Sequence, residues 1–160
     1  MPDSLLDQLR QATRPIHDRL HDLDPTSDRE AYARFLAAMA AGHGRLAGRG
    51  QATSGELLER LEADLDQLPK VPREDLPAAD SDAGRLGELY VMTGSRMGSA
   101  AMLSDLRKRH ADWPMQYLAA AKPTEAWPEL KETLAQAPAD DAETAAAVWL
   151  FEQVERRMRA

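Results

Sequence analysis

The chain has 160 residues, of which 43% are hydrophobic and 29% are charged, and its formal net charge is -7. This length fits one domain, and the composition is that of a globular protein with its own core. The negative charge disfavours binding to a nucleic-acid backbone, and the lack of cysteine excludes disulfides, thiolate metal sites and cysteine nucleophiles. Because the sequence shows neither a long apolar run nor a basic leader, we expect a soluble, cytoplasmic protein with no nucleic-acid and no membrane partner.

Apolar residues at helical spacing predict a first helix from about residue 4 to about residue 22. Pro15 lies inside this helix, where a proline removes one backbone hydrogen bond. We therefore expect a kink or a restart, for which Thr13 is the candidate N-cap. The apolar stripe consists of Leu5, Leu9, Ala12, Ile16, Leu20 and Leu23.

Two further helices are predicted in the first half of the chain. Ser27 and Glu30 have the spacing of a capping box, which indicates that a second helix begins at Ser27. Four glycines are expected to loosen the end of that helix. Ser54 is the expected cap of a third helix, which Pro69 ends. The glycines are Gly42, Gly44, Gly48 and Gly50.

The second half begins with the longest proline-free segment, from about residue 82 to about residue 109, which predicts one long helix. Shorter helices are expected at about 114–121 and 124–137, and a last one at about 140–159. No alternating strand pattern is present. The sequence therefore predicts an all-α, single-domain bundle of about six or seven helices over residues 1–160.

The centre of the long segment reads Gly94-Ser95-Arg96-Met97-Gly98. Each glycine costs about 1 kcal/mol relative to alanine inside a helix, and two glycines four residues apart lie on one face. The bare backbone at that face allows a close approach. It fits either tight packing against a second helix or a flat ligand lying on the helix.

The stretch ATRPIHDRLHDL places His17 and His21 one helical turn apart. Two such histidines are either ordinary residues at the boundary of a solvated helix or candidate ligands. Arg10 and Arg14 lie on the two preceding turns of the same helix. A neutral imidazole beside an apolar cavity, with guanidinium groups nearby, suits a planar apolar ligand that carries a metal and peripheral carboxylates.

Two segments together resemble the haem oxygenases. The segment LRQATRPIHDRL is similar to the proximal helix of that family, and LGELYVMTGSRMGSAAML is similar to the distal helix of its bacterial members. The segment AYARFLAAM also matches in kind and position. The resemblance covers most of the chain in order and spacing, and it implies a haem-oxygenase-like helical fold.

The resemblance implies that His17 is the proximal ligand of the haem iron. Gly94 and Gly98 would line the distal face, and Ser95 would support a distal water network. It also implies that basic residues at the start of the first helix contact the haem propionates or steer toward them. These residues are Arg10 and Arg14.

Further positions bear on the same site. Tyr90, one turn before the first glycine, either forms a hydrogen bond near the pocket or simply packs. Arg156 either reaches the propionates from the last helix or only complements the dipole of that helix. Ser99 and His21 depart from the family pattern, because a glycine and an acidic residue are usual there, and Ser99 would place a hydroxymethyl group near the distal pocket.

The implied activity is oxidative ring opening of haem with O₂ and electrons, which gives biliverdin, CO and ferrous iron. Haem would be both cofactor and substrate, and a reductase or ferredoxin would be the external electron donor, docking near Arg10, Arg14, Arg19 and the distal helix. The product would serve iron release or a biliverdin-binding photoreceptor. The departures, together with a short chain, leave open a non-catalytic protein that binds haem or acts as an interaction or regulatory module.

The remaining histidines and the tryptophans have plainer interpretations. His43 and His110 are expected in surface or capping roles. The three tryptophans are expected in core or edge packing rather than around a cofactor. They are Trp113, Trp127 and Trp149.

Overall fold

The computed structural model describes residues 3–122 and 125–160, and within these ranges every regular element is a helix. The expectation of an all-α chain is therefore confirmed for the described residues. In chain order the elements are α1 (Leu5–His21), α2 (Arg29–Gly48), α3 (Ala52–Leu65), α4 (Arg85–Ser95), the 3-10 helix η1 (Arg96–Gly98), α5 (Ser99–Arg109), α6 (Gln116–Ala120), α7 (Ala126–Gln136) and α8 (Asp141–Arg159).

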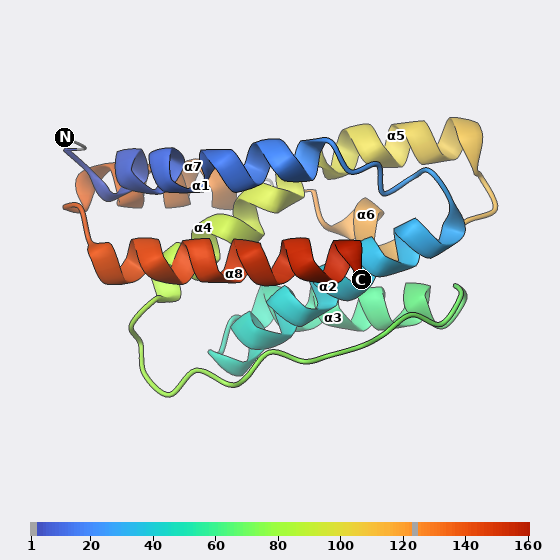
Figure 1. The fold of residues 1–160 in the computed structure, drawn as a ribbon, viewed down its shortest axis with the longest axis horizontal. Coiled ribbons are helices and arrows are strands. Elements are labelled where there is room, and N and C mark those ends of the chain that lie inside the picture. Colours follow the sequence, from blue (N-terminus) through green and yellow to red (C-terminus); the bar gives the residue numbers. More distant parts are fainter. Residues whose placement is uncertain (1–2, 123–124) are drawn as a thin grey trace.

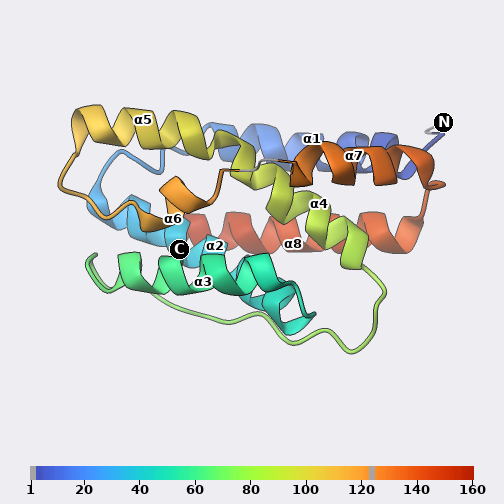
Figure 2. The ribbon, with the colours of Figure 1, turned by 180° about the vertical axis from the view of Figure 1, so that it is seen from behind.

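Helix α8 is the centre of the arrangement. It packs against α1, α2 and α4, while α3 packs against the outer side of α2 (Figure 1). The opposite view shows α5 and α7 on the side of the molecule away from α3, and α4 running obliquely from them to the level of α8 (Figure 2). Helices α1 and α4 also both contact α7, so α7 and α8 are neighbours of both.

Helix α1 runs through Pro15 as one element, so the expected restart at Thr13 is wrong. Ser4 caps its N-terminus by accepting a hydrogen bond from the Asp7 amide. The Thr13 hydroxyl does not cap a new helix but donates to the Leu9 carbonyl at 2.7 Å. Because the apolar face of α1 is buried while Pro15 is exposed, packing keeps the helix continuous despite the missing donor.

Helix α2 is capped by Asp28, whose carboxylate accepts from the Ala31 amide at 2.8 Å, rather than by Ser27. Glu30 pairs with Arg34 on the next turn and does not complete a capping box. The helix also continues to Gly48, so the glycines do not loosen it.

Gly42 shows why a glycine-rich helix end is stable here. A Cβ atom at this position would collide with the Met92 side chain of α4. The glycine therefore lets α2 and α4 approach closely, and tertiary packing outweighs its low helix propensity.

The predicted long helix over 82–109 is interrupted by η1, which begins directly after Ser95 and ends at Gly98. Weak helix formers and a tighter 3-10 turn divide the segment into α4 and α5. Within η1 the Arg96 side chain turns inward and its Nε donates to the Ala121 carbonyl at 2.7 Å.

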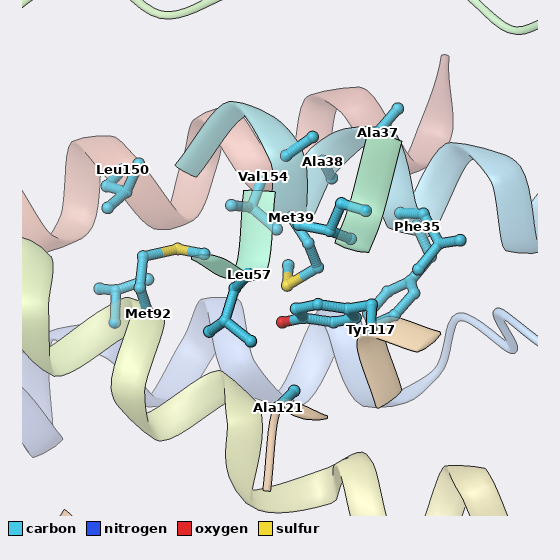
Figure 3. Packing of buried hydrophobic residues seen from close by; sticks show 14 of the residues in the cluster. Phe35, Ala37, Ala38, Met39, Leu57, Met92, Tyr117, Ala121, Leu150 and Val154 are labelled. Atoms are coloured by element: carbon cyan, nitrogen blue, oxygen red, sulfur yellow. The ribbon is translucent and has the colours of Figure 1, made fainter. Parts of the chain in front are cut away.

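Figure 3 shows part of the core, in which Met39, Leu57 and Tyr117 converge from α2, α3 and α6. These side chains are buried, and the Tyr32 hydroxyl is also satisfied, because it donates to the Pro114 carbonyl at 2.8 Å. The core therefore lies between α8, α2 and the helices that surround them.

One buried ion cluster joins α2 to α4. The Glu88 carboxylate binds Arg45 at 2.8 Å and Arg49 at 3.0 Å. Burial opposes ionisation of Glu88, but the hydrogen bonds from Arg49 and Arg45 outweigh it and hold the pKa of this carboxyl below its usual value. The start of α4 is thus fixed against α2.

Candidate functional site

A groove of about 820 Å³ lies between α1 and the α4–η1 segment. This volume falls within the range of about 300–1,000 Å³ that is typical of small-molecule sites. Residues from α1, α2, α4, η1, α5, α7 and α8 line it, together with the turn that follows α1. The sequence-predicted site residues that it brings together are Arg10, Arg14, His17, Tyr90, Gly94, Ser95 and Gly98.

His17 lines this groove from α1, and 68% of its side chain is exposed. Its Nδ1 lies 3.8 Å from the Asp18 carboxylate, which is itself mostly exposed. His21 lines the groove one turn later. Both imidazoles are therefore accessible to a ligand, and neither is enclosed in the core.

Arg10 and Arg14 line the groove on the two turns of α1 that precede the histidine. Neither guanidinium forms an ion pair with any residue in the ranges 3–122 and 125–160. By contrast, Arg19 binds Glu155 through Nε at 2.8 Å and Nη2 at 3.0 Å. On α1, Arg10 and Arg14 at the groove are therefore available to an anionic ligand, whereas Arg19 is already paired.

The two glycines of the distal segment have different surroundings. A Cβ atom built on Gly98 meets nothing within 4 Å, whereas one built on Gly94 would lie 3.1 Å from Cη2 of Trp127. The indole of Trp127 reaches the groove from α7, with its ring centre 5.8 Å from that of Tyr90. The backbone at Gly98 therefore faces open space. At Gly94 the indole of Trp127 occupies the space beside the backbone.

Trp127 was expected to pack in the core or at an edge, and its place in the groove was missed. Trp127 is half-buried, and it both packs beside Tyr90 and lines the groove. Nothing in the local sequence signals this, because it depends on how α7 packs beside α4.

Ser95 lines the groove, and its hydroxyl donates to the Met92 carbonyl at 3.0 Å. Ser99 is buried and lies outside the lining, so the expected intrusion of its hydroxymethyl group is wrong. The 3-10 turn between the two serines separates their directions, so that only Ser95 faces the groove.

Arg156 also lies outside the groove, so of its two interpretations the contact with a ligand there is wrong. Its Nη2 is 3.5 Å from the Glu74 carboxylate, in the segment between α3 and α4. Val154 and Met158 are the neighbouring α8 residues that line the groove. Arg156 is two positions from each of them, about 200° around the helix, and therefore points elsewhere.

Apolar side chains from α2 and α8 form another part of the groove lining. Phe35 and Phe151 are 9% and 7% exposed, and Val154 is 3% exposed. This surface belongs to the hydrophobic core and excludes water from one side of the groove. Its members are Phe35, Met39, Phe151, Val154 and Met158.

His43 is buried in α2, which corrects its expected surface role. Its Nε2 lies 3.2 Å from the Tyr117 hydroxyl, and its Nδ1 lies 3.4 Å from the Ser54 hydroxyl. Burial, assisted by the charge of Arg96, lowers the pKa of His43 to about 3. Ser54 is therefore a partner of this imidazole and not the cap of α3, which follows Gln51 without a side-chain cap.

His110 is the C-cap residue of α5, in agreement with a capping role, and its ring stacks on Trp113 at 3.9 Å. Trp113 is buried, as expected. Neither residue lies in the groove.

Searches against protein-family models, curated proteins and solved structures each found no match for this chain. Among the described residues, no helix is both long enough and apolar enough to cross a bilayer. The chemistry of the groove therefore rests on the residues that line it.

Proposed function

We propose that the groove binds haem through His17 and that the protein is a haem oxygenase, which opens the ring oxidatively. The observation that carries this proposal is that His17 and Gly98, which belong to two separate motifs with the same resemblance, line one groove with an apolar wall. A groove of about 820 Å³ has room for a ligand of this class.

The donor set fits a haem. The macrocycle supplies four nitrogen ligands and needs one protein imidazole, which the groove presents at His17. Its two propionates match the two guanidinium groups of Arg10 and Arg14. Ser99, the departure that would have narrowed the distal side, lies outside the lining, and this removes one objection to the proposal.

Bound haem would supply an iron centre that binds O₂ and the ring that is converted to biliverdin, CO and ferrous iron. The residues of this chain would bind and orient it. His17 would hold the group through an imidazole nitrogen. The apolar wall excludes water, Gly98 leaves open space beside the backbone, and Ser95 contributes a hydroxyl oxygen that can accept a hydrogen bond. Electrons would come from an external donor, a reductase or ferredoxin.

The test is titration of the purified chain with haem, followed by absorption spectroscopy in the presence of ascorbate and O₂. We expect a Soret band that decays as a biliverdin spectrum develops. His17→Ala should abolish the histidine-ligated spectrum. His21→Ala, which removes an imidazole from the same groove one turn away, is the matched control and should retain it.

Two outcomes would change the proposal. Haem that binds through His17 but stays intact under reduction would support the alternative of a non-catalytic haem-binding protein. Absence of saturable binding, or binding that survives His17→Ala and is lost in His21→Ala, would overturn the ligand assignment.

A further inference from the structure

A second cavity of about 300 Å³ lies on the other side of α4 from the groove. The α4–η1 residues that line it are Leu89, Met92, Thr93 and Arg96, whereas Tyr90, Val91, Gly94 and Ser95 line the groove. The two sites are therefore separated by the helix itself. The remaining lining comes from α2, α3 and α7, with Gln51 at the start of α3.

Arg96 is the charged group of this cavity that is most deeply buried. It is 9% exposed, and its Nε donates to the Ala121 carbonyl at 2.7 Å. In the described part of the chain it forms no ion pair, and its two terminal nitrogens form no hydrogen bond. Burying a cation without a counter-charge is unfavourable, so an anion that paired with this guanidinium would relieve that cost.

The terminal nitrogens of Arg96 are accessible. No fully enclosed side-chain nitrogen or oxygen among the described residues lacks a hydrogen-bond partner, so within the described structure the terminal nitrogens of Arg96 are not fully enclosed. The open space beside this side chain that the structure shows is the cavity that Arg96 lines. Two adjacent N–H groups of a guanidinium present the geometry that binds two oxygens of one carboxylate or phosphate.

Several hydroxyl groups also belong to the lining. Ser54 and Thr93 are buried, and Thr53 and Thr133 also face the cavity. His43 lines it as a neutral imidazole, because burial keeps its pKa at about 3. The cavity thus combines one cation with several neutral hydrogen-bonding groups.

One carboxylate, Glu129 of α7, shares the lining. Glu129 is exposed, and it does not pair with Arg96. Its charge opposes the entry of an anion, and its rotation toward Arg96 would provide an internal counter-charge instead of a ligand. The test must therefore separate these two cases.

We propose that this cavity is a binding site for a small oxyanion, a phosphate or carboxylate group, held by the free edge of Arg96 and the neighbouring hydroxyls. Burial lowers the pKa of Arg96, as expected for a guanidinium whose charge is uncompensated. The small volume suits a single anionic group rather than a large molecule. This site is independent of the haem proposal, because it uses none of the groove residues.

The experiment is isothermal titration of the full chain with inorganic phosphate and, separately, with formate, against sodium chloride at equal ionic strength. We expect saturable binding of at least one oxyanion and none of chloride. Stronger binding of phosphate would assign the site to phosphate groups, and stronger binding of formate to carboxylates. Arg96→Gln should weaken binding by about tenfold or more, which corresponds to the loss of a bidentate charged contact.

Because Arg96→Gln removes a buried side chain and can impair folding, a second variant tests the site from its rim. Glu129→Gln should tighten binding by about two- to fivefold by removing a like charge. Glu132→Gln, an exposed change on the same helix outside the cavity, is the matched control and should leave the affinity unchanged. Absence of oxyanion binding in the native chain, or binding that neither Arg96→Gln nor Glu129→Gln alters, would overturn the proposal.

Discussion

Gly87 of α4 lies directly against the backbone carbonyl of Glu143 in α8, so close that a Cβ atom at this glycine would overlap it. The Glu143 carboxylate reaches back and accepts hydrogen bonds from the amides of Leu86 at 2.7 Å and Gly87 at 3.2 Å. A side chain of α8 thus satisfies free amides at the start of α4. This contact sets the position of the helix that forms one wall of the groove.

The first prediction concerns this close approach. Gly87→Ala should lower the free energy of unfolding by about 3 kcal/mol, because a backbone carbonyl cannot move aside as a flexible side chain can. Gly98→Ala is the control, since a methyl group there meets open space, and it should leave stability unchanged or raise it by up to about 1 kcal/mol. Urea unfolding followed by circular dichroism measures both, and equal stability of the two variants would contradict the prediction.

The buried ion cluster gives a second prediction. Glu88→Ala should destabilise the protein by about 3–5 kcal/mol, because it leaves Arg45 and Arg49 without their shared carboxylate. Glu30→Ala removes a carboxylate from the exposed pair with Arg34 and should change stability by less than about 1 kcal/mol. Chemical denaturation at neutral pH distinguishes the two. A small effect of Glu88→Ala would contradict the prediction and mean that the cluster contributes little to stability.

The buried imidazole of His43 predicts a dependence of stability on pH. In the folded chain its pKa is lowered to about 3 from a usual value of 6.5, so below pH 6.5 the unfolded chain takes up a proton that the folded chain excludes. The contribution of His43 to stability is therefore complete above pH 6.5 and declines as the pH falls toward 3.

The variant His43→Gln removes this titration. It should be less stable than the native chain at neutral pH, and the difference should shrink by about 2 kcal/mol between pH 7.5 and pH 5, since each pKa unit is worth about 1.4 kcal/mol. Unfolding curves at several pH values measure it. A stability difference that stays constant with pH would show that His43 titrates normally.

The free guanidinium groups at the groove provide a fourth prediction, which rests on haem as the ligand. Arg10→Gln and Arg14→Gln should each weaken haem binding by about tenfold, with a smaller salt dependence of the affinity than the native chain shows. Arg19→Gln, on the same helix but paired with Glu155, should change the affinity little. Spectroscopic titration at two ionic strengths provides the affinities, and equal losses in all three variants would argue for a general charge effect.

Local patterns predicted those features of the fold that depend on near neighbours in the sequence. The apolar spacing on α1 and the proline after α3 gave helices close to those observed. Their caps were less well predicted, because the competing candidates Ser27 and Asp28 differ only in how the preceding turn folds. The continuity of α2 through Gly42 depends on Met92 of a distant helix, which no local pattern contains.

The candidate site was predictable where a motif carried it and not where packing supplied it. His17 and Gly98 came from recognisable segments, whereas Trp127 and Met158 reach the groove through the placement of α7 and α8. The burial of His43 had a usable signal, since it continues the helical spacing of the buried residues Leu36 and Met39. A polar residue in register with such a stripe is better interpreted as part of the core.

The interruption at η1 divides the wall opposite α1 into two parts that are anchored differently. The α4 part is fastened at its start to α8 through Glu143 and to α2 through Glu88, whereas α5 packs against α6 and η1. The α4 part is thus the wall of the groove that is held in place. We expect the groove to widen at its α5 end when a large ligand enters. Hydrogen exchange of the backbone amides should therefore be faster in α5 than in α4.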